Sequence, residues 1–110
     1  GVSRYLKEKD NNIQIIGVQP TEGSRIPGIR RWQSEYVPEI FNDAIVDQII
    51  DISQSDAEKS MSDLSKNNGL FVGVSAGANI HISKTIATDL NNAVIVTILC
   101  DRGDRYLSNI

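Results

Sequence analysis

The chain has 110 residues, 40% of them hydrophobic, with 11 basic and 14 acidic side chains and a net charge of −3. This length fits one modest domain, and the acidic balance argues against nucleic acid or an anionic membrane as a partner. No apolar run is long enough for a membrane helix, and Cys100, the single cysteine, excludes an intrachain disulfide and favours a cytoplasmic protein.

The first half of the chain predicts two strands separated by a long loop. The β-branched run IQIIGVQP (13–20) is typical of a buried strand, and VDQIIDIS (46–53) predicts a second one. About twenty intervening residues, rich in glycine and proline, predict an irregular loop of the kind that often carries function. The charged opening GVSRYLKEKD reads as the end of a helix, so we expect a segment of a longer protein.

A helix is predicted after the second strand. Ser55 and Glu58 have the spacing of a capping box, and Gly69 gives a stop signal directly after Asn68. The expected buried stripe of this helix consists of Ala57, Met61 and Leu64.

The second half of the chain repeats the alternation of strand and helix. LFVGVS (70–75) is strand-like, and apolar residues then recur at helical spacing at Ile82, Ile86 and Leu90. VIVTILC (94–100) has the strongest strand signal and is expected to be central and covered on both faces. This order predicts an α/β domain with a mostly parallel sheet flanked by helices.

Ligands of such sheets bind beyond the carboxyl ends of the strands, where residues 75–79 and 100–104 are expected to form turns. The first turn contains G-x-S-x-G, the pattern of a hydrolase nucleophile elbow around Ser75. A serine nucleophile needs a histidine base, but His81 follows by six residues with no acid between them. The pattern therefore does not predict a hydrolase, and one cysteine with one histidine does not predict a metal site.

Four motifs, read together, identify a family resemblance. GVSRYLKE (1–8), IPGIRRW (26–32), GVSAGAN (73–79) and CDRGDRYLS (100–108) resemble, in this order and spacing, the C-terminal part of the cysteine synthases, or O-acetylserine sulfhydrylases. These are pyridoxal-phosphate enzymes of fold type II, and the B isozyme is the most similar. The resemblance implies that residues 1–110 are the C-terminal portion of the large cofactor-binding domain.

The resemblance also implies roles for seven residues. Ser75 matches the serine that hydrogen-bonds the pyridine nitrogen of pyridoxal 5'-phosphate, and a hydroxyl is too weak an acid to keep that nitrogen protonated. Cys100 and Asp101 match the pair beside the pyridine ring. The residues that match the loop above the active site and its mouth, where substrate binds, are Gly28, Ile29, Arg30 and Arg31. From composition alone, Arg30-Arg31-Trp32 could either clamp an anion or be two solvated arginines beside a buried ring.

The implied activity is cysteine biosynthesis, in which sulfide or thiosulfate replaces the acetate of O-acetyl-L-serine. A small amino-acid substrate, a sulfur donor and a homodimer are the implied partners. The family's Schiff-base lysine matches no lysine here, so we expect no catalytic residue in this segment and no activity from it alone. Two alternatives stay open: a related β-replacement enzyme such as a cystathionine β-synthase, and a non-catalytic module that docks serine acetyltransferase.

Overall fold

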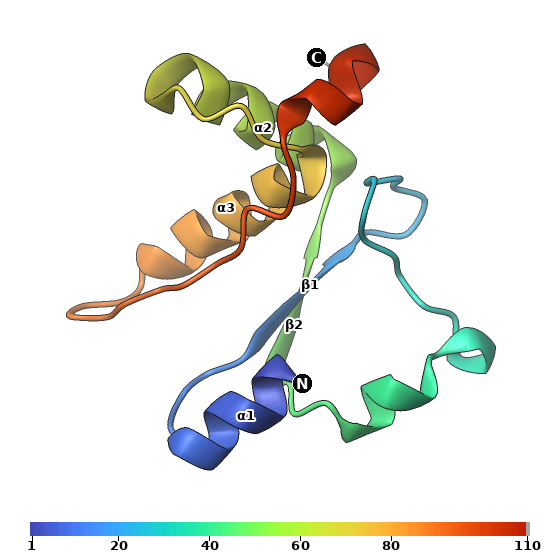
Figure 1. Cartoon of the computed structure of the whole chain (residues 1–110), viewed down its shortest axis with the longest axis vertical. Coiled ribbons are helices and arrows are strands. Elements are labelled where there is room, and N and C mark those ends of the chain that lie inside the picture. The colour runs from blue at the N-terminus through green and yellow to red at the C-terminus, as the bar shows by residue number, and fades with distance from the viewer. Residues whose placement is uncertain (110) are drawn as a thin grey trace.

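A computed structural model describes residues 1–109 of the chain (Figure 1). The elements in chain order are α1 (Val2–Lys9), β1 (Ile16–Pro20), β2 (Gln48–Ile52), α2 (Gln54–Asn68) and α3 (Val74–Ala87), with short 3-10 helices at Ser34–Tyr36, Glu39–Asp43 and Gly103–Asn109. The molecule is thin, with extents of 40 × 38 × 22 Å. In the described range, no helix is both long and apolar enough to cross a membrane.

The sheet consists of β1 and β2, which run parallel and pair along all five residues of each strand. This pairing confirms both predicted strands and the predicted α/β class, although each strand is shorter than the apolar run that suggested it. The residues between them form the expected irregular loop, interrupted by two 3-10 helices. Val18 and Ile50 from the two strands pack against the buried core, which lies between the sheet and the long helices.

Helix α2 begins one position after Ser53, whose hydroxyl accepts a hydrogen bond from the Asp56 backbone N–H at 3.2 Å. The prediction of Ser55 as the capping residue is therefore wrong, because Ser55 lies inside the first turn. Both serines have an acidic residue three positions later, so the capping pattern alone does not distinguish them. Gly69 ends the helix as predicted, with the positive φ of 68° that glycine adopts without strain.

Helices α2 and α3 approach each other closely at Gly77. A Cβ atom at this position would overlap the carbonyl oxygen of Ala57 and lie 2.8 Å from the backbone nitrogen of Met61. The buried core around this contact consists of Ile26, Ile52, Ala57, Met61, Val74, Ala78 and Ile82. The predicted stripe of α2 is confirmed, but Leu90, expected on the stripe of the next helix, lies beyond α3 and is 45% exposed.

The predicted strand at 94–100 is wrong for the part of the chain that the structure describes. These residues run beside α3 without regular structure (Figure 1), and Asn79 Nδ2 donates a hydrogen bond to the carbonyl oxygen of Ile98 at 3.1 Å. Instead of being covered on both faces, Val94 is 90% and Val96 is 84% exposed. No strand within residues 1–109 pairs with this run, and an apolar sequence cannot replace the backbone hydrogen bonds of a neighbour.

The strand-like run at 70–75 is also not a strand. Val72 forms an isolated antiparallel bridge with Arg102, and α3 already begins at Val74. The expected turn at 75–79 is therefore the first part of α3. This early start matters for the site, because it buries Ser75 in the first turn of a helix instead of exposing it on a loop.

Candidate functional site

Ser75 is the centre of the candidate site and is only 4% exposed. It lies in the first turn of α3, where the capping residue is Gly73 and no side chain caps the free N–H groups. The Ser75 hydroxyl makes no hydrogen bond to the backbone and side-chain groups that the structure describes. The Ser75 hydroxyl is therefore available to a group that binds from outside the described chain.

His81 is directed away from Ser75. Its Nε2 atom lies 4.0 Å from Oδ2 of Asp56, across the contact between α3 and α2. Six residues of helix also separate it from Ser75 by about 9 Å along the helix axis. The nucleophile elbow therefore has no base of its own in this fold, in agreement with the prediction from sequence.

A tight turn covers Ser75. The Ile29 backbone N–H donates to the Ile26 carbonyl at 3.2 Å, and Gly28 between them has a φ of +95°, as a turn with proline before glycine requires. A Cβ atom built on Gly28 would lie 3.4 Å from both Cβ and Oγ of Ser75. The positive φ is therefore the reason for glycine here, since a Cβ atom would meet Ser75 only at van der Waals distance.

The segment around Asp101 reaches the same end of α3. The Gly73 backbone N–H donates to the Asp101 carbonyl at 3.1 Å, and the Gly103 N–H donates to the Phe71 carbonyl at 3.0 Å. Cys100, one residue earlier, is exposed, and its thiol lies 3.7 Å from the carbonyl oxygen of Ile98. The structure therefore brings the chain at 100–101 to the helix end that carries Ser75, as the motifs suggested.

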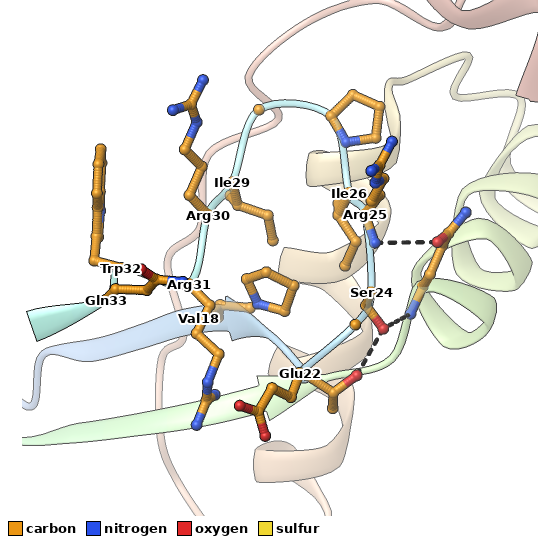
Figure 2. Close-up of a pocket in the computed structure, with 16 residues that line it drawn as sticks. Val18, Glu22, Ser24, Arg25, Ile26, Ile29, Arg30, Arg31, Trp32 and Gln33 are labelled. Atoms are coloured by element: carbon orange, nitrogen blue, oxygen red, sulfur yellow. Dashed lines mark hydrogen bonds between the residues drawn. The ribbon is translucent and has the colours of Figure 1, made fainter. Parts of the chain in front are cut away.

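A cleft of about 1210 Å³ opens beside this turn (Figure 2). Residues 20–33 line it, together with Val18 and Gln54. Figure 2 shows Arg30 and Trp32 on one side of the backbone segment and Arg31 on the other. The guanidinium of Arg30 lies 5.8 Å from the centroid of the Trp32 ring, which is 46% exposed and so is not the buried ring of one sequence interpretation.

Asp51, which the sequence analysis missed, binds Arg31 from outside the lining of the cleft. Its Oδ1 atom accepts hydrogen bonds from Gln19 Nε2 at 2.7 Å and from Arg31 Nη1 at 3.0 Å. These two donors, the Gln19 amide more than the Arg31 guanidinium, hold the pKa of Asp51 below its ordinary value. The available signal was its place as the one acidic residue within the apolar strand QIIDI.

The structure thus divides the predicted site residues into two groups. Gly28 faces Ser75 at the start of α3, where the Asp101 carbonyl accepts a hydrogen bond from the Gly73 N–H. Ile29, Arg30 and Arg31 line the cleft that begins at Gly28. The exposed Cys100 belongs to neither contact directly.

The model of the family described as "Pyridoxal-phosphate dependent enzyme" matches residues 1–101. Over 109 residues the chain is 51% identical to the cysteine synthase B of Pseudomonas aeruginosa, which covers 99% of this chain and 36% of that protein. The chain therefore spans about a third of the length of the curated relatives it matches.

Two solved structures extend the comparison. A cysteine synthase from Entamoeba histolytica is 33% identical with a TM-score of 0.80, covering 97% of this chain and 34% of that one. An O-acetylserine dependent cystathionine beta-synthase from Helicobacter pylori is 35% identical with a TM-score of 0.78, and the match covers 96% of this chain and 37% of that one. Both similarities run along almost the whole chain.

Proposed function

We propose a cysteine synthase function for this chain, which belongs to the pyridoxal-phosphate dependent enzyme family. The observation that carries the proposal is the 51% identity to cysteine synthase B over nearly the whole chain. The complete enzyme would make L-cysteine by replacing the acetate of O-acetyl-L-serine with sulfide or thiosulfate. Residues 1–110 would form the C-terminal portion of its large cofactor-binding domain.

Exposed apolar side chains support this place within a larger domain. Val94, Val96 and Ile98 alternate along one extended segment and are 90%, 84% and 67% exposed. Alternation with a period of two is the pattern of a strand that buries one face. We expect the rest of the domain to supply the backbone partners and the covering layer that residues 1–109 do not contain.

The residues at the start of α3 fit the pyridine end of pyridoxal phosphate. Ser75 is a buried residue in the first turn of α3, and the side of Gly28 that carries no Cβ faces its hydroxyl. When bound, the cofactor withdraws electrons from the amino-acid substrate and so assists the loss of acetate. The task of Ser75 would be to hydrogen-bond the ring nitrogen without a negative charge that would keep it protonated.

The remaining predicted residues would complete the surroundings of this site. Cys100 and Asp101 would lie beside the pyridine ring, with Asp101 already fixed to the start of α3 through its backbone. Gly28 and Ile29 would form the wall of the substrate pocket. Arg30 and Arg31 would stand at its mouth, where positive charge attracts an anionic sulfur donor.

The other proposals concern the whole protein. We propose a homodimer in the cytoplasm with small-molecule substrates; the free Cys100 fits a reducing compartment, and the substrates follow from the proposed cysteine synthase function. A cystathionine β-synthase remains the second candidate, because one solved neighbour with that name is 35% identical. Its lower identity makes cysteine synthase the better supported function.

The test uses the complete enzyme that contains this chain. O-acetyl-L-serine is supplied with sulfide, thiosulfate or homocysteine, and we expect cysteine to form faster than cystathionine; faster formation of cystathionine would contradict the proposal. Ser75→Asp should lower kcat roughly tenfold or more, since a charged partner stabilises the protonated ring nitrogen. The matched control is Ser83→Ala in the same helix, whose hydroxyl only donates to the Asn79 carbonyl at 2.8 Å.

A further inference from the structure

We propose that Asp51 is a positioning residue that holds Arg31 to the sheet and so presents Arg30, at the mouth of the cleft, to the anionic sulfur donor. The two arginines then have different tasks, although they are neighbours in sequence. This inference rests on the proposed function for the identity of the donor. Its structural part, the attachment of the segment at 30–33, can be tested independently.

The group that binds Arg31 is the Asp51 carboxylate, and residues of both strands hold it in place. Asp51 and Gln19 stand opposite each other in the parallel register of β2 and β1. The side-chain amide of Gln19 donates a hydrogen bond to Asp51 Oδ1 at 2.7 Å and so orients the carboxylate independently of Arg31. Arg31 then binds the same oxygen at 3.0 Å. The acceptor is therefore preorganised by the sheet.

Arg31 is the main tether of its segment. Within the described chain, residues 30–33 make no other side-chain hydrogen bond to the sheet or the long helices. The two partners are 41% and 42% exposed, so the ion pair is modest in strength and can open and close. A change at Asp51 should therefore loosen this segment without unfolding the protein.

Holding Arg31 also fixes the direction of Arg30. Successive side chains of an extended backbone point to opposite sides, and Figure 2 shows this for the two arginines. The charge of Arg31 is balanced by Asp51, whereas Arg30 forms no ion pair with the side chains that the structure describes and lies 5.8 Å from the Trp32 ring. Arg30 is therefore the arginine of this pair with positive charge available to a ligand.

The experiment compares Asp51→Asn, Arg31→Gln and the double variant in the complete enzyme. Asp63→Asn is the matched control, because it breaks an exposed ion pair with Lys59 on α2, away from the cleft. Brief trypsin digestion under native conditions, followed by mass spectrometry, measures cleavage directly after Arg30. We expect Asp51→Asn and Arg31→Gln each to accelerate this cleavage about two- to fivefold. The control should match the wild type.

Steady-state kinetics with thiosulfate provide the second measurement. The KM for thiosulfate should rise about two- to fivefold in Asp51→Asn with kcat unchanged, and the double variant should add nothing further. The positioning role would be overturned if Asp51→Asn left the cleavage after Arg30 unchanged, or if it accelerated this cleavage without raising the KM for thiosulfate. It would also be overturned if the effects of Asp51→Asn and Arg31→Gln added up in the double variant. If Asp51→Asn speeds cleavage but the wild type makes no cysteine, the attachment stands, and both the proposed function and the role toward the donor fail.

Discussion

Replacing Gly77 with alanine tests the close contact between α2 and α3 that places Ser75. The added methyl group would overlap the carbonyl oxygen of Ala57 and come within 2.8 Å of the Met61 nitrogen. Both atoms belong to backbone, so no change of rotamer can relieve the overlap. Forcing extra volume into a packed core costs about 1–3 kcal/mol and occasionally more.

A second effect opposes this cost, since alanine is about 1 kcal/mol more favourable than glycine inside a helix. The overlap with two backbone atoms places Gly77→Ala at the upper end of the range. We therefore expect a net loss of about 1–2 kcal/mol in the free energy of unfolding. Because Ser75 lies two residues away in the same turn, we also expect weaker binding of pyridoxal phosphate.

Urea denaturation of the complete enzyme, followed by far-ultraviolet circular dichroism, measures the effect. Gly17→Ala is the matched control, because its new methyl group would meet nothing closer than a side-chain atom, Val46 Cγ1 at 3.3 Å. Its midpoint should shift less than that of Gly77→Ala. A Gly77→Ala enzyme as stable as the wild type would refute the packing argument, because the helix preference of alanine would then outweigh the overlap.

Two further predictions concern stability. The Asp47 carboxylate accepts a hydrogen bond from the Ile15 N–H and forms an ion pair with Lys7, and both contacts lower its pKa. Its contribution to the free energy of unfolding is therefore fully present above the unfolded pKa of about 3.9. This contribution is lost as the pH falls through the lower pKa of the folded state. Asp47→Asn should therefore be less stable than the wild type at pH 7 by urea denaturation, with a difference that closes below about pH 4; a constant difference would contradict this. Ser53→Ala should cost about 1 kcal/mol in the same assay and Ser55→Ala less than about 0.5, and equal effects would contradict the assignment of the cap.

Local signals predicted most of the fold correctly. The two short parallel strands, the helix that ends at Gly69 and the helix that contains Ile82 and Ile86 all follow from apolar spacing and from residues that start or stop elements, although the start of that last helix at Val74 was missed. The segment at 94–100 was predicted wrongly, because a strand depends on a neighbour that its own sequence does not specify. The capping residue was missed because two serines have the same local pattern.

The site depends on contacts between distant residues, which local patterns do not contain. The motifs suggested Gly28 and Ser75 separately, but only the fold shows that Gly28 faces the serine side chain. Likewise, Asp51 and Arg31 are twenty residues apart, and only the fold brings them into hydrogen-bond contact, while the register of β1 and β2 places Gln19 beside Asp51. The sequence therefore predicted which residue types matter and left their pairing to the fold.

The central claim is that Ser75 binds the ring nitrogen of pyridoxal phosphate. A crystal structure of the complete enzyme with the cofactor bound tests it most directly, through the distance between Ser75 Oγ and the pyridine nitrogen. We predict a hydrogen bond of about 2.7–3.2 Å, with Gly28 above Ser75. A ring nitrogen that instead contacts a carboxylate, or a Ser75 hydroxyl bound only to protein, would contradict the account.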